Sequence, residues 1–567
     1  MLVTYFIAFI ILLSQDTVFN LCSAQTGPVV NTTLGRIEGT IMKSFQNKSI
    51  YAFRGIPYAQ PPIGNLRFAA PEPIQQFEYE IFQATADSAV CPQPLPYFNM
   101  DEDCLTLNVF TKNFDAKLPV IVYIHGGSNI IGTGNSIYGG GPQYLMDHDV
   151  VYVAFNYRLG ALGYLRTSGD NVKGNFGYLD QLLVLKWVNE HIANFGGDPD
   201  NVTIMGMSAG AMAVSLHLAS PLSKNLFHRA ILMSGSATNH YANDNAHWTR
   251  KLAREISCPA YDPVDVVECL RGVSWKKIIK ICGRWEPYSF VNLKWIYEID
   301  DYFMPEHPTA LIEKGEFNRV PLLVSFTENE LDYSVNYHLD NPRLLDDFNV
   351  NFVEYAPEMF TFDYNLTRSQ KIKDFYLDDN LTQFNNENIE DLGRIFSDAI
   401  LGHGIYRLVQ LARKYTDVYY TRIDYVGQSI KSTAPLTEHN VYKGVAHSDD
   451  LQYVMPAFLK LMPTNGSDVF MMERITEWFT NFAKTGSPVS SSENWPPCNS
   501  TVMNLLYNDV NTTLGLPAYT DRYELWDELF PTPGSAKGGA INLSGSQLSV
   551  FMIAIATGVT SWLMSIN

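Results

Sequence analysis

A serine stands at the centre of the sequence Gly206-Met207-Ser208-Ala209-Gly210, which is a G-x-S-x-G pattern. The apolar run Val202–Met205 precedes the pattern, and a helical run follows it. A sharp turn from a strand into a helix lifts a serine hydroxyl above a sheet, and the crowding at such a turn requires glycine. The first N–H groups of the following helix favour developing negative charge. This context predicts that Ser208 is an acyl-transfer nucleophile rather than part of a structural turn.

Acyl transfer also needs donors for an oxyanion. The sequence His125-Gly126-Gly127-Ser128 follows the apolar run Leu118–Ile124. A glycine-rich turn at the end of a strand can direct backbone N–H groups at an oxyanion, although an ordinary turn has the same composition.

The acid and the base are constrained by their order after the serine, since an acid precedes the histidine in this architecture. The apolar run Val320–Phe326 ends beside three carboxylates, those of Glu328, Glu330 and Asp332. The base is expected after the last sheet strand, near 418–423, which leaves His439 and His447. The residue pattern alone leaves both choices open.

The elements that must position these residues are short apolar, β-rich runs separated by helical patterns. Several runs are continuously apolar, as expected for a parallel sheet that is covered on both faces. The clearest helical pattern is Tyr178–Phe195. The alternation predicts an α/β fold with a mostly parallel central sheet and helices on both faces. The runs are Leu118–Ile124, Val150–Phe155, Val202–Met205, Ala230–Met233, Val320–Phe326 and Val418–Ile423.

Composition excludes several classes of protein. The 567 residues are 46% hydrophobic and 17% charged, which is unlike a disordered chain. The formal net charge of −19 argues against a nucleic-acid partner, because phosphates need a basic surface. The Cys and His spacing does not resemble a zinc site, and Ser-His-acid chemistry needs neither a metal nor a cofactor.

The two ends of the chain predict export and membrane attachment. Residues 1–24 have an apolar core followed by Cys22-Ser23-Ala24, which is typical of a secretory signal peptide. Residues 534–567 contain small residues, a polar spacer and an apolar tail, as in a signal for a glycosylphosphatidylinositol (GPI) anchor. A transmembrane helix is the alternative for the tail. Because no Ser/Gly linker occurs before 534, residues 25–533 are predicted to form one domain.

Glycosylation sequons and cysteines agree with an extracellular location, secreted or on the outer face of the plasma membrane. Six cysteines remain after the signal segment, and their spacing alone does not fix their pairing. A ninth sequon, Asn542, lies in the predicted tail segment. The other Asn-x-Ser/Thr sequons begin at Asn31, Asn47, Asn201, Asn365, Asn380, Asn465, Asn499 and Asn511.

Several motifs together resemble those of the type-B carboxylesterase family, which includes carboxylesterases, cholinesterases and insect juvenile-hormone esterases. The resemblance covers roughly residues 28–530. It implies an α/β-hydrolase fold and hydrolysis of a small hydrophobic ester. The motifs are FRGIPYAQPP at 53–62, EDCLTLNVF at 102–110, NYRLG at 156–160, GNFG at 174–177 and FGGDP at 195–199, followed by the Ser208 pattern.

Carried over to matching positions, the resemblance implies the triad Ser208, Glu330 and His447. It implies oxyanion N–H donors at Gly127, Ser128 and Ala209. It also suggests the disulfides Cys91–Cys104 and Cys258–Cys269, and leaves Cys282 and Cys498 unassigned.

The sequence departs from the family at two positions near the serine. Ser128 stands where the family usually has glycine, and Met207 stands where it often has glutamate. The segment between Cys91 and Cys104 has no tryptophan that could bind choline by cation–π attraction, which argues against acetylcholine as substrate. Two alternatives to a carboxylesterase are a non-catalytic surface adhesion or binding protein of the same fold and a surface cholinesterase.

Overall fold

The computed structural model describes residues 27–533, except for 96–98, 170–171, 242–243, 286–292, 378–380, 430–431, 433–443, 457–462, 465, 491–492, 500–503, 509–510 and 516–518. The predicted signal segment 1–24 and anchor segment 534–567 lie outside the described residues. Within the described ranges, no helix combines the length and apolar character needed to cross a bilayer.

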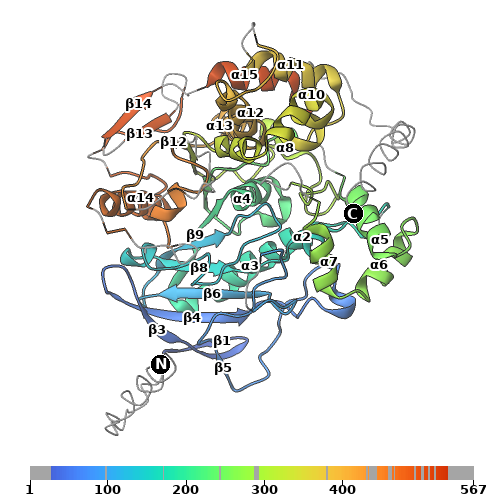
Figure 1. The fold of residues 1–567 in the computed structure, drawn as a ribbon. Coiled ribbons are helices and arrows are strands. Elements are labelled where there is room, and N and C mark those ends of the chain that lie inside the picture. Colours follow the sequence, from blue (N-terminus) through green and yellow to red (C-terminus); the bar gives the residue numbers. More distant parts are fainter. Residues whose placement is uncertain are drawn as a thin grey trace, which may run out of the picture.

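The described residues form a large twisted sheet of eleven strands (Figure 1). The neighbouring strands β8, β7, β9, β10, β11, β12 and β13 run parallel to one another. At the two edges of the sheet, β14 on one side and β6, β4 and β3 on the other add antiparallel pairs. This arrangement confirms the predicted α/β class. The order is β14 (Asn511–Gly515), β13 (Asn504–Asn508), β12 (Val418–Ile423), β11 (Leu322–Thr327), β10 (Arg229–Met233), β9 (Gly197–Met207), β7 (Leu118–Ile124), β8 (Val151–Phe155), β6 (Thr106–Thr111), β4 (Ser49–Pro57) and β3 (Thr40–Lys43).

A second, three-stranded sheet is formed by short strands from the first part of the chain. It is made of β1 (Val29–Thr32), β2 (Gly35–Glu38) and β5 (Ile81–Gln83). The sequence prediction did not include these short strands.

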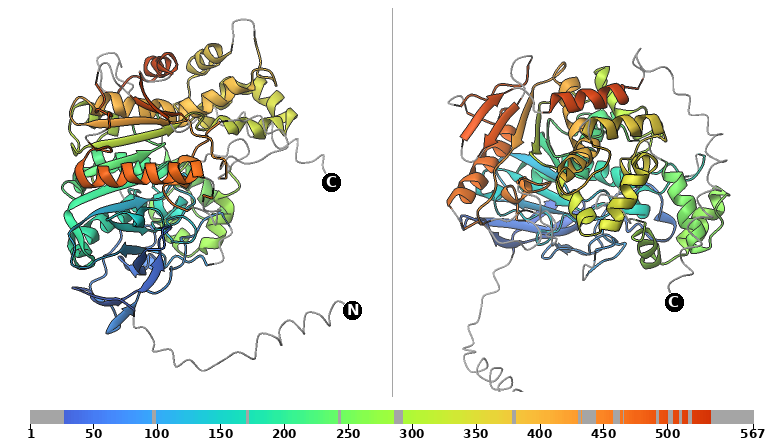
Figure 2. Two further views of the ribbon diagram at one scale, coloured as in Figure 1. Left: turned by 90° about the vertical axis from the view of Figure 1, so that its left-hand side faces the viewer. Right: turned by 45° about the horizontal axis from the view of Figure 1, so that its top comes forward.

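Both faces of the large sheet are buried, which explains its continuous apolar runs. In β7, Val120 and Val122 pack into one hydrophobic core, whereas Ile121 and Tyr123 pack into another. Alternate side chains of a strand point to opposite faces, so two cores require an unbroken apolar run. The first core includes residues of α3 (Phe176–His191) and α4 (Ala209–Ala219), and the second includes residues of α14 (Gly466–Thr485). Figure 2 shows helices on both sides of the sheet.

The remaining helices follow the carboxyl ends of the sheet strands or pack around them. Figure 1 shows two groups, one around α5 to α7 and one that contains α10 to α13 and α15. Their bounds are α2 (Gly160–Tyr164), α5 (Asn245–Ile256), α6 (Pro263–Arg271), α7 (Trp275–Cys282), α8 (Pro308–Glu313), α9 (Val335–Leu339), α10 (Pro342–Met359), α11 (Leu366–Tyr376), α12 (Ile389–Ser397), α13 (His403–Ala412) and α15 (Thr520–Leu529).

Two disulfides confirm the pairing that the family resemblance suggested. Cys91 bonds to Cys104, and Cys258 bonds to Cys269. Cys282 and Cys498 lie outside both bonds. The first bond closes the loop that leads into β6, and the second joins the end of α5 to α6.

Candidate active site

Ser208 lies on the turn between β9 and α4, as the sequence predicts. Its backbone has φ 58° and ψ −124°, a conformation that residues with a Cβ atom rarely adopt. The N–H of Ser208 donates to the carbonyl of Met233 at 2.8 Å, and its own carbonyl accepts from Met212 at 2.9 Å in the first turn of α4. These bonds hold a strained turn that places Ser208 at the helix N-terminus, partly exposed.

Glycines allow this turn to pack closely. A Cβ atom on Gly206 would lie 2.3 Å from the carbonyl carbon of Gly210, so the two sides of the turn touch through their backbones. A Cβ atom on Gly126 would lie 2.5 Å from the carbonyl oxygen of Met207 and 3.0 Å from Cβ of Ser208. The turn after β7 is therefore in contact with the candidate nucleophile.

The structure brings Glu330 and His447 together, although they are far apart in sequence. Nδ1 of His447 lies 2.6 Å from Oε2 of Glu330. The other carboxylate oxygen of Glu330 accepts from the N–H of Thr327 at 2.8 Å. The Glu330 side chain is only 3% exposed, and that of His447 is 11% exposed. A buried carboxylate with fixed orientation is suited to hold a histidine in one tautomer.

Backbone bonds also align the two loops. The N–H of His447 donates to the carbonyl of Glu330 at 2.8 Å, and the N–H of Asn329 donates to the carbonyl of Val445 at 3.1 Å. Asn329 and Ala446 form a parallel bridge. The acid and the base are therefore held in register by the main chain as well as by their side chains.

The competing acids have different environments. Asp332 accepts from Asn329 at 2.8 Å and from Ser397 at 2.5 Å, and burial raises its pKa. Partial burial, with the nearby carboxylate of Asp424, raises the pKa of Glu328. His439, the alternative base, lies outside the described residues. Of the three carboxylates, it is Glu330 that the structure places against His447.

The segment 126–132, here called the oxyanion loop, follows β7. Gly127, Ser128 and Asn129 all have left-handed backbone, with φ of 108°, 53° and 60°. Among the described residues, none accepts a hydrogen bond from the N–H of Gly127, Ser128 or Ala209. Backbone N–H groups without a protein acceptor can stabilise a developing oxyanion.

Two buried titratable groups lie beside these residues. His125 stacks on Tyr157 with ring centroids 4.2 Å apart, and burial lowers its pKa to about 4. Burial, with the nearby carboxylate of Glu330, raises the pKa of Asp450 to about 7. His125 is therefore neutral at pH 7, and Asp450 adds a second carboxyl group near the Glu330–His447 pair. Sequence reasoning missed Asp450, although it lies three positions after His447.

Met207 connects the elements of the site. Its sulfur accepts from the hydroxyl of Ser448 at 3.6 Å, and a Cβ atom on Gly126 would lie 3.3 Å from that sulfur. Its side chain packs in the second hydrophobic core. An apolar thioether thus lies between the oxyanion loop and the His447 loop.

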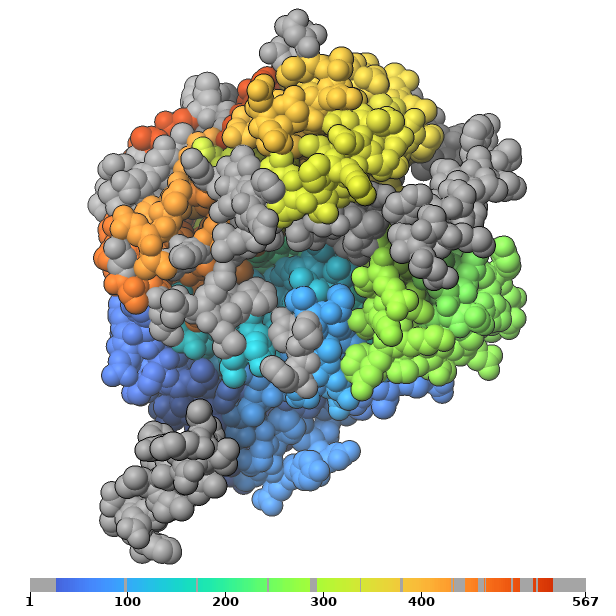
Figure 3. Space-filling view, viewed as in Figure 1, coloured from blue at the N-terminus to red at the C-terminus, as the bar shows by residue number. Residues whose placement is uncertain are grey.

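Two groups of helices flank a recess on one face of the molecule. In Figure 3, the green region around α5 to α7 and the yellow region around α10 to α12 lie on either side of it. These helices follow the carboxyl ends of β10 and β11. Ligands of open α/β sheets bind beyond the carboxyl ends of the strands.

The predicted glycosylation asparagines differ in accessibility. Asn31, Asn47 and Asn499 are exposed, and Asn201 and Asn365 are partly buried. Asn380 and Asn465, and the side chain of Asn511, lie outside the described residues. Within the described ranges, no group of three or more His, Cys, Asp or Glu side chains is arranged to hold a metal ion.

Comparison with known proteins gives a consistent result. The model of the carboxylesterase family matches residues 26–526. Juvenile hormone esterase of Tribolium castaneum is 34% identical over 497 residues, which cover 81% of this chain and 84% of that protein. Esterase FE4 of Myzus persicae is 34% identical, covering 84% and 88%. Acylcarnitine hydrolase of Mus musculus is 28% identical, covering 90% and 92%.

Proposed function

The chain belongs to the carboxylesterase family, and on this premise we propose that it hydrolyses carboxylic esters through a Ser208–Glu330–His447 triad. The family and the esterase relatives make the chain a carboxylic ester hydrolase. The observation that carries the triad is the 2.6 Å contact between Nδ1 of His447 and Oε2 of Glu330. This contact leaves Nε2 of His447 as the basic nitrogen.

In the acylation step, Oγ of Ser208 attacks the ester carbonyl carbon while its proton moves to Nε2 of His447. The N–H groups of Gly127, Ser128 and Ala209 donate to the oxyanion that forms, and one such donor typically contributes about 3–4 kcal/mol. The bond to the alcohol oxygen then breaks. The alcohol leaves with the proton from Nε2, and the acyl group stays on Ser208.

In the deacylation step, a water molecule gives a proton to Nε2 of His447 as its oxygen attacks the acyl carbon. The bond between the acyl carbon and Oγ of Ser208 then breaks. The carboxylic acid leaves, and Ser208 regains its proton from Nε2. Throughout both steps, the carboxylate of Glu330 stabilises the imidazolium and maintains its orientation. The proposed sequence uses no metal or cofactor.

The substrate is proposed to be a small, uncharged, hydrophobic ester. Met207 places a thioether beside the nucleophile at a position where a carboxylate would attract a cation. Juvenile hormone esterase, one of the relatives, is named for a hormone ester rather than for a choline ester. Both features favour a neutral ester over a choline ester.

The protein is proposed to act outside the cell, secreted or held on the plasma membrane by the predicted C-terminal lipid anchor. The two disulfides support this location, because disulfides persist in oxidising compartments. The exposed sequons at Asn31, Asn47 and Asn499 support glycosylation there.

The test is labelling of the exported protein with a fluorophosphonate, followed by peptide mapping and ester kinetics. We expect a stoichiometric adduct on Ser208, together with turnover of naphthyl acetate that greatly exceeds turnover of acetylthiocholine. Ser208→Ala should lose both the adduct and the turnover. A folded wild-type protein without an adduct would contradict the triad and favour the non-catalytic binding role.

A further inference from the structure

The oxyanion loop adopts a conformation that its own residues do not favour. The three consecutive residues Gly127, Ser128 and Asn129 have positive φ, and only the first is glycine. Residues with a Cβ atom pay a steric cost in this region, although asparagine tolerates it better than most. Hydrogen bonds must therefore hold it. Within the loop, the N–H groups of Ile130 and Ile131 donate to the carbonyl of Gly127 at 2.9 and 3.0 Å, and two buried side-chain amides join the loop to its surroundings.

The first contact is the side-chain amide of Asn129, which is 1% exposed. Its Nδ2 donates to the hydroxyl of Tyr178 at 2.9 Å and to the carbonyl of Trp295 at 3.0 Å. The hydroxyl of Tyr164 lies 3.4 Å from its Oδ1. Its backbone carbonyl accepts from Gly160 at 2.7 Å. The residue directly after Ser128 is thus bound to α2, to α3 and to the segment around 295.

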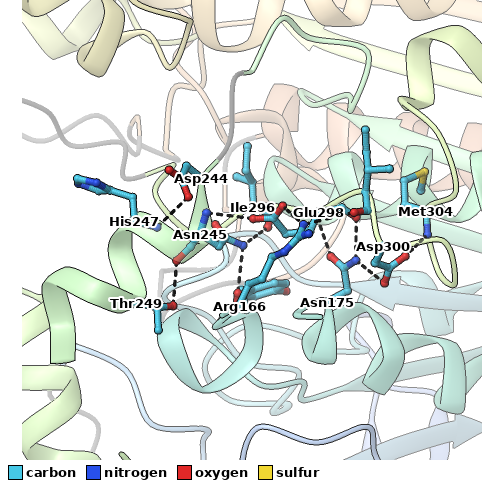
Figure 4. A network of polar contacts seen from close by, with 12 residues as sticks. Arg166, Asn175, Asp244, Asn245, His247, Thr249, Ile296, Glu298, Asp300 and Met304 are labelled. Carbon is cyan, nitrogen blue, oxygen red and sulfur yellow. Dashed lines mark hydrogen bonds and ion pairs between the residues drawn. The ribbon is translucent and has the colours of Figure 1, made fainter. Parts of the chain in front are cut away.

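That segment is itself firmly anchored (Figure 4). Glu298 donates its N–H to Oδ1 of Asn175 at 2.9 Å, and its carboxylate accepts from Arg166 at 2.6 Å and from the N–H of Asn245 at 3.0 Å. Asn245 also donates through Nδ2 to the carbonyl of Ile296 at 2.8 Å. The carbonyl that Asn129 binds therefore belongs to a segment with little freedom to shift.

The second contact is the side-chain amide of Gln93, also 1% exposed. Its Oε1 accepts from the N–H of Gly132 at 2.8 Å, and its Nε2 donates to the carbonyl of Gly132 at 2.9 Å and to that of Cys91 at 3.0 Å. A Cβ atom on Gly132 would lie 2.5 Å from the carbonyl oxygen of Gly126. Gln93 therefore joins the disulfide-bonded loop to the end of the oxyanion loop that packs against its start.

We propose that Asn129 and Gln93 are positioning residues that hold the N–H groups of Gly127 and Ser128 at the oxyanion. This inference rests on the proposed function. The two amide side chains are buried and act at opposite ends of the loop, and buried polar groups are costly to leave unpaired. Because oxyanion bonds strengthen in the transition state, losing this alignment lowers kcat more than it changes KM.

The experiment compares Asn129→Leu, Asn129→Gly and Gln93→Met with the wild-type protein. Asn129→Gly removes the amide and also the strain of positive φ, so it separates the two effects. The matched control is Asn349→Leu on α10, because the amide of Asn349 pairs with both backbone groups of Phe384 at 2.8 Å, much as Gln93 pairs with Gly132. Active protein is counted by fluorophosphonate titration taken to completion. The inhibition constant of a trifluoromethyl ketone, which forms a hemiketal oxyanion on the serine, is also measured.

We expect the three loop variants to lose about 10- to 100-fold in kcat per active site, with KM changed by less than about threefold. The trifluoromethyl ketone should bind more weakly by the same factor as kcat falls. Asn349→Leu should keep the wild-type value of kcat per active site. If Gln93→Met does not fold, Gln93→Glu replaces it, because this change keeps the acceptor for the N–H of Gly132 and puts a carboxylate oxygen in place of the donor to the carbonyls of Gly132 and Cys91.

Four results would count against the proposal. One is an unchanged kcat in the loop variants, and another is an equal loss in the Asn349→Leu control, which would indicate a general loss of stability. Full activity of Asn129→Gly would reduce the role of Asn129 to backbone conformation. A wild-type protein that forms no adduct on Ser208 would remove the proposed function, and with it this inference.

Discussion

Replacing Ser208 by glycine is expected to abolish ester turnover and yet to leave a more stable protein than replacement by alanine. Both variants lack the hydroxyl, so they differ in the Cβ atom alone. At φ 58° and ψ −124°, a Cβ atom costs about 1–3 kcal/mol that glycine does not pay. Glycine also has more conformational freedom than alanine in the unfolded chain, which lowers the stability of the glycine variant by about 0.4–1 kcal/mol.

Ser274 supplies a matched control. Like Ser208, it is the N-cap residue of a helix and its side chain makes no capping bond, but its φ is −57°. At each serine, the free energy of unfolding of the alanine variant is subtracted from that of the glycine variant. Subtracting the value at Ser274 from the value at Ser208 then cancels the effects of glycine on the unfolded chain and on helix capping. The remainder should be about 1–3 kcal/mol in favour of glycine at Ser208.

The assay is thermal unfolding of the four variants at one scan rate. With an unfolding entropy of about 2.1 cal/mol/K per residue, roughly 500 residues give about 1 kcal/mol per degree. The corrected midpoint should therefore be about 1–3 °C higher for Ser208→Gly than for Ser208→Ala. Equal differences at the two serines would show that the elbow stores no strain at Ser208, and the reasoning would be refuted.

Three further predictions concern the surroundings of the site. Replacing both Cys91 and Cys104 by serine opens a loop of 13 positions and should cost about 3 kcal/mol of stability, measured by urea unfolding. Because burial raises the pKa of Asp450 from 3.8 to about 7, the native state keeps a proton that the unfolded chain releases, and native stability falls as pH rises between about 4 and 7. Asp450→Asn should flatten that dependence by at most about 4 kcal/mol, measured as unfolding midpoints at pH 5 and pH 8. Gly126→Ala should lower kcat about 100-fold by displacing Ser208, whereas Gly272→Ala, whose Cβ would meet its nearest neighbour at 3.4 Å, should leave kcat unchanged.

The strands were predictable where burial alone defines them. The apolar run Leu118–Ile124 coincides with β7, because each of its faces packs into a core. The run Val202–Met205 marks only part of β9, which begins at Gly197. In its polar first half, Gly197 lies opposite Leu118 of β7, the register then shifts, and pairing resumes at Val202 opposite Val120. Hydrophobic patterning does not detect such backbone pairing.

The residue pattern predicted only the part of the site that neighbouring residues in the sequence form. Ser208 and its glycines form one turn, so the sequence motif contains the geometry. The acid and the base meet across 117 positions, and residue patterns reduced them only to three carboxylates and two histidines before the family resemblance separated them. Asn129 and Gln93 were missed because their partners lie elsewhere in the chain. Asparagine directly after a Gly-Gly-Ser turn was the one available signal, since asparagine tolerates left-handed backbone.

The parallel bridge between Asn329 and Ala446 has a consequence for how this protein can be redesigned. Backbone hydrogen bonds between the two loops, rather than the length of the chain that connects them, set the distance between Glu330 and His447. The alignment of the acid and the base therefore depends on two short backbone segments, 329–330 and 445–447. A redesign of this enzyme that is meant to preserve its proton transfer should leave both segments unchanged.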